Sequence, residues 1–372
     1  MNLEIREDLW ESLAKTRKRV VLYGMGNGAD KILQACAAKG IEVEDFFASD
    51  GFVRGHLFHG RPVRSWSEIK ALYGAENVVV LLSFGTSRPE VLENIYRIAA
   101  ETELYAPDVP AFGDGIFDRA FFEEHRREIE TAYELFTDEE SKRIYENVLR
   151  FKLTGDLSCL RAAESDREAT LTTLVRPAEI AVAADLGAYN GDTVRELLEH
   201  AEGRVRRIYA MEPDARNFRK LEAYAAEERR AQVLPFPVGA WSEQTTLYFD
   251  GSGNRNASFE SNRSATLADR PAKSKAIAAD TLDHVLDGQR VDYIKYDVEG
   301  SEKEALLGSA DTIGACYPRL LVSLYHRNED LFALPLMIKE AFPEYDRFTL
   351  RRFAGVPAWD LNLYVEKKSG KK

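Results

Sequence analysis

Two acids at the ends of apolar runs are well placed to do chemistry. Residues 180–186 form an almost continuous apolar run that ends at Asp185 and a glycine loop, residues 187–191. A second apolar run, residues 207–211, leads into Glu212, which lies 27 positions after Asp185. Because glycine has no Cβ, such a loop lets backbone approach a ligand closely. An acid at the tip of the following strand can bind both hydroxyls of a ribose. Together they predict a nucleoside site.

The glycine loop has the pattern Asp-x-Gly-x-x-x-Gly, not the Gly-x-Gly-x-x-Gly of dinucleotide sites. This difference favours a nucleoside that carries an amino acid over one that carries a pyrophosphate, since no phosphate has to be held at a helix N-terminus. An ordinary strand end with a solvated acid is the alternative. The residues predicted to bind the cofactor are Asp185, Gly187, Ala188, Asn190, Gly191, Thr193, Glu212, Pro213, Val238 and Gly239.

A third group of titratable residues follows two later strands. One strand presents Lys295, Asp297 and Glu299 near its end, and the next, residues 319–325, presents His326. The carboxyl ends of neighbouring parallel strands lie at one edge of a sheet, where ligands bind. We therefore predict that these four side chains are catalytic.

Three roles are open for this cluster. Asp297 or Glu299 could act as a general base, with His326 accepting the proton or orienting the base. Asp297, Glu299 and His326 could instead hold a divalent metal, Mg²⁺ or Mn²⁺, with water completing an octahedral shell. In a purely structural alternative, Asp297 caps the helix that begins near Ser301, and Glu299 pairs with Lys295.

These motifs resemble those of the FkbM family of methyltransferases. The resemblance spans about residues 180 to 366, roughly half of the chain, and Lys-x-Asp-Val-Glu-Gly at 295–300 is its most specific part. It implies S-adenosylmethionine as the cofactor and methyl transfer to a hydroxyl of a sugar, a glycan precursor or a related small molecule. The segments that carry it are Asp185 to Thr193, Glu212-Pro213-Asp214, Thr281-Leu282-Asp283 and Ile294 to Glu302.

Methyl transfer from a sulfonium is an in-line displacement, so the nucleophilic oxygen must be held near the methyl, opposite the sulfur. A sugar hydroxyl is a poor nucleophile at neutral pH and needs a base or a metal. A long loop rich in Gly, Ser and Asn, from 250 to about 275, is either functional or mobile. It offers Arg255, Asn256, Ser258 and Arg263 to a polar or anionic acceptor.

A second α/β unit precedes this domain. A strand at 18–24 runs into Gly24-x-Gly26-x-x-Ala29 and a helix, and Asp50 lies 26 residues after the first glycine. This fits a relaxed dinucleotide fingerprint, so Gly24, Gly26, Gly28 and Asp50 are predicted to form a second nucleotide site, for NAD(P) or a nucleotide sugar. The alternative is a Rossmann-like domain that keeps the glycine turn for packing.

The chain is therefore predicted to be an α/β protein of three segments. A Rossmann-like domain occupies 1–112, a helical connector 113–176, and a domain with a class I methyltransferase sheet 177–372. The resemblance implies seven strands in that sheet, the last one antiparallel. Thr137-Asp138-Glu139-Glu140 carries the start signal of the connector's second helix.

Composition and charge argue against two classes of protein, nucleic-acid-binding proteins and membrane-spanning proteins. A net charge of −12 argues against a nucleic-acid surface, and no apolar run approaches the length of a membrane span. The polar, acidic first residues and the three dispersed cysteines predict a cytoplasmic protein with reduced thiols. Two open sheets and a helical connector are compatible with a homodimer.

Two functions of other classes stay open. One is an NAD(P)- or nucleotide-sugar-dependent enzyme centred on Gly24 to Asp50, although no Tyr-x-x-x-Lys or comparable acid–base pair is evident beside that motif. The other is a non-catalytic binding protein. Intact acids at 185, 212, 297 and 299 count against it, since a decayed site has no physical reason to retain all four.

Overall fold

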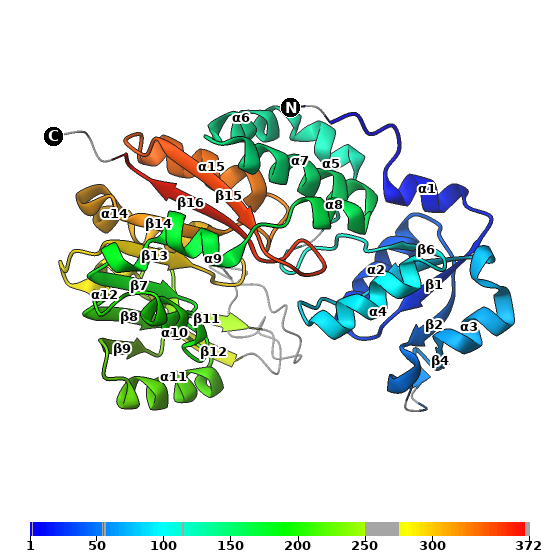
Figure 1. The fold of residues 1–372 in the computed structure, drawn as a ribbon, viewed down its shortest axis with the longest axis horizontal. Helices are drawn as coiled ribbons and strands as arrows, with labels where there is room; N and C mark the ends of the chain where they lie inside the picture. The colour runs from blue at the N-terminus through cyan, green and yellow to red at the C-terminus, as the bar shows by residue number, and fades with distance from the viewer. Residues whose placement is uncertain (2, 54, 56, 114, 250–274, 369–372) are drawn as a thin grey trace, which may run out of the picture.

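The computed structural model describes the chain except for residues 2, 54, 56, 114, 250–274 and 369–372. One sheet is built from the first hundred residues and a second from the last two hundred, with a helical segment between them (Figure 1). The acceptor-binding role predicted for Arg255, Asn256, Ser258 and Arg263 lies outside the described residues.

The amino-terminal sheet has six strands in the order β3-β4-β2-β1-β5-β6. All neighbours are parallel except the β3–β4 hairpin. The run VVVLL of β5 is buried throughout, as expected of a central strand covered on both faces. The elements are α1 (Leu9–Lys15), β1 (Arg19–Tyr23), α2 (Asn27–Ala38), β2 (Val43–Ala48), β3 (Leu57–Phe58), β4 (Arg61–Ser65), α3 (Trp66–Tyr73), β5 (Val78–Leu82), α4 (Pro89–Ala99) and β6 (Glu103–Tyr105).

The connector is helical, and its second long helix begins where the start signal predicted. Asp138 caps α7 by accepting a 2.7 Å hydrogen bond from the backbone N–H of Ser141. The same helix packs on the second sheet, because the Ser141 hydroxyl accepts a 2.8 Å hydrogen bond from the Leu350 backbone. The helices are α5 (Arg119–Glu124), α6 (Arg126–Leu135), α7 (Glu139–Thr154), α8 (Leu157–Ala162) and α9 (Arg167–Thr170), which continues as a π-helical turn (Leu171–Val175).

The second sheet has seven strands in the order β15-β16-β14-β13-β7-β8-β9, and β16 is antiparallel to both of its neighbours. This confirms the predicted seven-stranded sheet with an antiparallel last strand. Its strands are β7 (Val182–Leu186), β8 (Arg207–Met211), β9 (Gln232–Phe236), β13 (Tyr293–Tyr296), β14 (Arg319–Ser323), β15 (Arg347–Arg352) and β16 (Leu361–Glu366).

Among the described residues, this half also contains a small sheet, β10-β12-β11, six further α-helices and a 3-10 turn (Pro177–Glu179). They are β10 (Gly239–Ala240), β11 (Thr245–Phe249), β12 (Lys275–Asp280), α10 (Asp192–Glu199), α11 (Ala215–Glu227), α12 (Leu282–Leu286), α13 (Glu302–Leu307), α14 (Ala310–Cys316) and α15 (Asp330–Ala341).

Strand register brings the two motifs of this half together. Lys295 of β13 lies opposite Asp185 of β7, and β14 flanks β13 on its other side. Side chains alternate between the faces of a strand, so Ala184 and Ile294 enter one apolar cluster while Ala183 and Tyr293 enter another. The residues that follow β7, β13 and β14 consequently meet at one edge of the sheet.

One apolar cluster extends through all three parts of the chain. It includes Tyr23 of β1, Tyr145 of α7 and Ile294 of β13. The boundaries at 112 and 176 therefore stay a prediction, since packing continues across both. The helices of the described residues are too short or too polar to span a bilayer.

Candidate active site

The predicted cofactor loop folds over the end of β8. The backbone N–H groups of Gly187 and Ala188 each donate a 3.0 Å hydrogen bond to the Met211 carbonyl. The Glu212 carboxylate accepts hydrogen bonds from the backbone N–H groups of Tyr189, at 2.9 Å, and Asp214, at 2.8 Å. Glu212 is thus held by the loop predicted to accompany it.

Val238 and Gly239 come to the same place. The Cβ position of Gly239 is 3.7 Å from the ring of Pro213, and the Glu212 backbone N–H donates to the Phe236 carbonyl at 3.0 Å. The turn after β9 therefore lies beside the turn after β8. The residues predicted in the two turns, Glu212 and Pro213 in one and Val238 and Gly239 in the other, therefore lie together.

The environment of Glu212 suits a ligand with hydroxyl donors. Burial raises its pKa to about 7 and the nearby Glu299 carboxylate adds to the rise, against the two backbone donors that lower it. Hydroxyls that donate to this carboxylate would favour its ionised form. The side-chain oxygen of Asn190 is also buried and has no hydrogen-bond partner among the described residues. Both groups fit the ribose and polar atoms of a nucleoside.

The loop glycines are required for packing within the protein. Gly187 has φ of +87°, and a Cβ there would lie 1.9 Å from the Asp297 carbonyl oxygen. Gly191 has φ of +84°, and its Cβ would lie 2.7 Å from the Tyr224 ring. The sequence predicts that these glycines let the backbone approach a ligand closely. In the structure they leave room for the end of β13 and for a side chain of α11.

Asp185 and Thr193 belong to a buried network around Lys295. The Lys295 ammonium lies 3.0 Å from Oδ1 of Asp185, and the other Asp185 oxygen accepts a 2.5 Å hydrogen bond from the Thr193 hydroxyl. Lys295 also donates to the Gly187 carbonyl at 3.2 Å and lies 3.7 Å from Oδ2 of Asp297. Burial lowers the pKa of Lys295, but Asp185 and Asp297 raise it above its usual value. In the structure, Lys295 pairs with Asp185 and Asp297 and not with Glu299, as the structural alternative supposed.

Asp297 does not cap a helix. Its Oδ1 accepts hydrogen bonds from the Ser323 hydroxyl at 3.0 Å and the Tyr325 hydroxyl at 2.9 Å. Burial raises its pKa, but Lys295 and His326 hold it below its usual value. The Asp297 side chain is 31% exposed, so an ionised carboxylate faces the edge of the sheet.

His326 is buried between two acids. Its Nδ1 lies 2.8 Å from Oε1 of Glu302 and its Nε2 lies 3.6 Å from Oδ1 of Asp297. Burial lowers the pKa of His326, but Glu302 and Asp297 raise it to about 9. At neutral pH the ring is an imidazolium. It can orient Asp297 but cannot accept a proton, so the orienting role suits it and the acceptor role does not.

Glu302 contacts His326, and the sequence did not predict it as a site residue. It belongs to the Asp-Val-Glu-Gly-x-Glu motif, but only the fold shows that it contacts His326. It is 1% exposed, and its Oε1 also accepts a 2.9 Å hydrogen bond from the Val298 backbone. Asp330 lies near it, and burial followed by the Glu302 charge raises the pKa of Asp330 to about 8.

The candidate metal set changes accordingly. Among the described residues, the group whose ligand atoms lie within 4.8 Å of one another is Asp297, Glu302 and His326, whereas Glu299 is exposed with φ of +52°. Both nitrogens of His326 face carboxylates. This donor set fits a hydrogen-bonded chain better than the oxygen-rich shells of Mg²⁺ or Mn²⁺.

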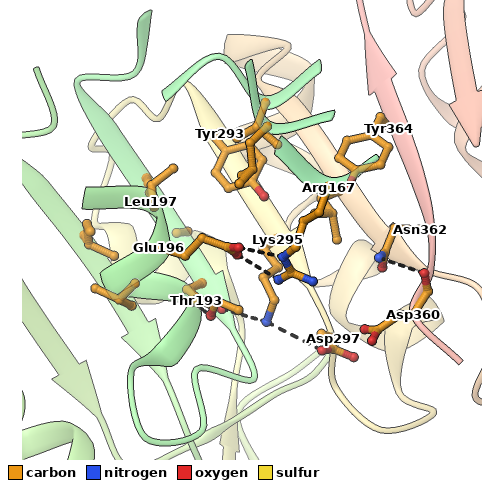
Figure 2. A pocket seen from close by; sticks show the side chains of 18 of the residues that line it. Arg167, Thr193, Glu196, Leu197, Tyr293, Lys295, Asp297, Asp360, Asn362 and Tyr364 are labelled. Atoms are coloured by element: carbon orange, nitrogen blue, oxygen red, sulfur yellow. Dashed lines mark hydrogen bonds and ion pairs between the residues drawn. The ribbon is translucent and has the colours of Figure 1, made fainter. Parts of the chain in front are cut away.

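A cavity of about 90 Å³ adjoins this edge and runs along the sheet toward α10 (Figure 2). Lys295, Asp297 and Asp360 lie together at one end. Arg167 of α9 enters it and binds both oxygens of Glu196, at 2.6 and 2.8 Å. No sequence motif marks Arg167, Glu196 or Asp360, because they come from separate segments.

The predicted second nucleotide site is organised differently. The Asp50 carboxylate accepts hydrogen bonds from the Ser67 backbone at 3.1 Å and the Ser67 hydroxyl at 2.6 Å, so it is engaged at the start of α3. A Cβ at Gly24 would lie 2.5 Å from the Phe84 ring, and one at Gly28 would lie 2.3 Å from the Ser83 carbonyl. Gly26, in contrast, has open space. The packing interpretation accounts for Gly24, Gly28 and Asp50.

Comparisons with known proteins agree with the carboxyl-terminal fold. Residues 185–352 match the family model of the methyltransferase FkbM domain. The chain is similar in structure to methyltransferase FkbM from Methylobacillus flagellatus KT, with a TM-score of 0.66 and 20% identity over 94% of this chain and 90% of that one. No curated protein matches the chain in sequence.

Two further solved structures align with only part of the chain. A putative O-methyltransferase from Klebsiella pneumoniae has a TM-score of 0.34 and 12% identity over 63% of this chain and 91% of that one. Fibrillarin from Aeropyrum pernix, with S-adenosyl-L-methionine bound, has a TM-score of 0.31 and 11% identity over 50% of this chain and 66% of that one. The likeness to the Methylobacillus protein extends over all three segments, and it concerns the fold.

Proposed function

We propose that this chain, whose residues 185–352 form an FkbM-type methyltransferase domain, is an S-adenosylmethionine-dependent O-methyltransferase. Its acceptor is a hydroxyl of a sugar, a glycan precursor or a related small molecule. One observation carries the proposal. The buried carboxylate of Glu212 and the ionised carboxylate of Asp297 follow parallel strands and lie at the same edge of the seven-stranded sheet, joined by the loop that begins at Gly187.

Glu212 and the glycine loop supply the nucleoside end of the site. The two Glu212 oxygens accept the ribose hydroxyls, and the buried oxygen of Asn190 accepts a further donor. Asp185, Thr193 and Lys295 hold the loop in place from beneath. When bound, S-adenosylmethionine supplies a methyl group on a sulfonium that is already activated for displacement.

Asp297 receives the acceptor hydroxyl. Ser323 and Tyr325 donate to Oδ1 and fix the carboxylate, while Oδ2, 3.7 Å from the Lys295 ammonium, accepts the hydrogen of the acceptor hydroxyl. As the new carbon–oxygen bond forms, the methyl–sulfur bond breaks and its electron pair leaves with the neutral thioether S-adenosylhomocysteine. The hydroxyl proton passes to Asp297, which acts as the general base. The His326 imidazolium, held by Glu302, keeps Asp297 ionised and oriented.

The test is transfer of radiolabelled methyl from S-adenosylmethionine to a panel of free sugars, methyl glycosides and hydroxylated small molecules. We expect label on a hydroxyl oxygen. Asp297→Asn should lower turnover by about 10²–10⁴-fold and leave binding of S-adenosylhomocysteine unchanged. Transfer to nitrogen or carbon would contradict the proposed chemistry, as would full activity in the Asp297→Asn variant.

A further inference from the structure

The loop between β15 and β16, residues 353–360, is held in place by all three parts of the chain. The buried guanidinium of Arg352 donates to the Leu160 carbonyl of α8 at 2.9 Å and to carbonyls within the loop itself. Val356 and Thr86 exchange two backbone hydrogen bonds, of 2.7 and 2.9 Å, which tie the loop to the amino-terminal domain. The end of this loop consequently has a fixed position.

The last residue of the loop, Asp360, lies in the cavity next to Asp297 (Figure 2). Its φ is +53°, a left-handed conformation that costs a residue with a Cβ about 1–2 kcal/mol. Burial raises the pKa of Asp360 and the Asp297 charge adds to that rise. The Asn362 amide, which also lines the cavity, donates to the Asp360 carbonyl at 3.3 Å. A strained acid beside another acid suggests a functional position.

The preceding residue, Trp359, is the exposed tryptophan of this protein. It is 42% exposed, whereas Trp10, Trp66 and Trp241 are 2%, 1% and 6% exposed. One edge of its ring packs on Gly85 of the amino-terminal domain, where a Cβ would lie 2.2 Å from the ring. The indole is therefore fixed along one edge while much of its surface stays accessible.

We propose that Trp359 and Asp360 form an acceptor subsite that holds a neutral sugar beside Asp297. This inference rests on the proposed function. An indole stacks on the apolar C–H face of a sugar ring, while carboxylate and amide groups such as those of Asp360 and Asn362 bind its hydroxyls. Trp359 directly precedes Asp360 in this fixed loop, and the proposed mono- or disaccharide contacts both side chains.

The charges of the cavity select the class of sugar. Its two cations already have partners, because Lys295 pairs with Asp185 and Arg167 with Glu196. Asp297 lies 3.7 Å from the Lys295 ammonium and 3.6 Å from His326. Asp360 is the acid at the acceptor end that forms no ion pair with the described residues lining the cavity. When ionised it would repel a phosphate or carboxylate group on the acceptor. The subsite therefore favours neutral glycosides over sugar phosphates and nucleotide sugars.

Trp359 provides its own reporter for this proposal. Acrylamide quenching of tryptophan fluorescence would be measured on the full-length protein with a panel of neutral methyl hexosides and deoxyhexosides, with and without S-adenosylhomocysteine. We expect at least one glycoside to protect Trp359 from quenching. Trp359→Phe should remove the response, and Trp10→Phe, at a buried position, should retain it.

Asp360→Asn tests the second half of the subsite without adding backbone strain, because Asn tolerates the left-handed conformation. This variant should bind the protecting glycoside at least about tenfold more weakly, with unchanged affinity for S-adenosylhomocysteine. Protection retained in full by Asp360→Asn would remove Asp360 from the subsite.

The outcomes separate this proposal from the proposed function. If no glycoside protects Trp359 although S-adenosylhomocysteine binds, the subsite is wrong and the methyltransferase assignment stands. Protection by glucose 6-phosphate but by none of the neutral glycosides would overturn the assignment of a neutral acceptor. Protection by a glycoside in a protein that does not bind S-adenosylhomocysteine would support the sugar subsite and contradict the proposed function.

Discussion

The Lys295 ammonium lies 3.0 Å from a carboxylate oxygen of Asp185, so a buried ion pair joins the two main sequence motifs of the carboxyl-terminal half. Both side chains are less than a tenth exposed, and the two residues are directly opposite each other in neighbouring strands. Asp185 was predicted to bind the cofactor and Lys295 to act in catalysis. The structure joins the two side chains in one buried ion pair, and the roles assigned to them stay predictions.

The first prediction concerns this pair. Lys295→Met leaves the Asp185 carboxylate buried without its cation and should lower the free energy of unfolding by about 3–5 kcal/mol, measured by urea denaturation. Arg88→Ala breaks an exposed pair with Glu90 and should change it by no more than about 0.5 kcal/mol. Equal unfolding midpoints for Lys295→Met and the wild-type protein would show that the pair contributes nothing.

The second prediction compares two free-energy costs at glycines with positive φ: the cost of a left-handed backbone and the cost of a steric clash. Gly203→Ala should cost about 1–2 kcal/mol for the left-handed backbone alone, since nothing lies within 4 Å of its Cβ position. Gly187→Ala should cost more, because its Cβ meets the Asp297 carbonyl, and should also weaken binding of S-adenosylhomocysteine. Urea denaturation and calorimetric titration measure the two effects, and similar losses in both variants would refute the packing argument.

The third prediction is a pH dependence of cofactor binding. The pKa of free Glu212 is raised to about 7, and hydroxyl donors from a ribose favour its ionised form. Affinity for S-adenosylhomocysteine should therefore fall as the pH drops through this value, by at most about tenfold per pH unit. Glu212→Gln should bind more weakly, by about 1.5–3 kcal/mol, with no such dependence. Titrations on both sides of neutrality test this, and a flat wild-type profile would contradict it.

The fourth prediction concerns the His326 imidazolium. Its pKa is raised to about 9, so the charged form is present below that pH and is lost above it. Because the charge keeps Asp297 oriented, turnover should fall as the pH rises through this value. Glu302→Gln removes a main cause of the raised pKa and should move the fall to lower pH. Glu299→Gln, at an exposed position, should not. A pH–turnover profile of Glu302→Gln identical to that of the wild-type protein would exclude this role.

Local patterns predict the parts of the site that follow directly from a strand. The glycine loop, Glu212 and Asp297 each come at the end of an apolar run. A few neighbouring residues are therefore enough to infer the strand and to place the residue at the carboxyl edge of the sheet. The seven-stranded sheet could be expected only through the family resemblance. The start of α7 was predicted because capping depends on Asp138 and the residues just after it.

Contacts between distant segments could not be predicted in this way. The partner of His326 is Glu302, and Arg167 of the connector binds Glu196 of α10, because the tertiary fold brings their elements together. Asp50 makes a contact that its spacing does not predict. Its spacing from Gly24 fits a ribose-binding acid, but Ser67 at the start of α3 offers nearer donors, and these engage the carboxylate.

The most direct test is calorimetric titration of S-adenosylhomocysteine into the wild-type protein and the Glu212→Gln and Asp50→Asn variants, with NADH as a parallel titrant. We expect one-to-one binding of S-adenosylhomocysteine to the wild-type protein and to Asp50→Asn, weak binding to Glu212→Gln, and no binding of NADH. Absence of S-adenosylhomocysteine binding, or full affinity in Glu212→Gln, would contradict it. Binding of NADH that Asp50→Asn abolishes would move the active site to the amino-terminal domain.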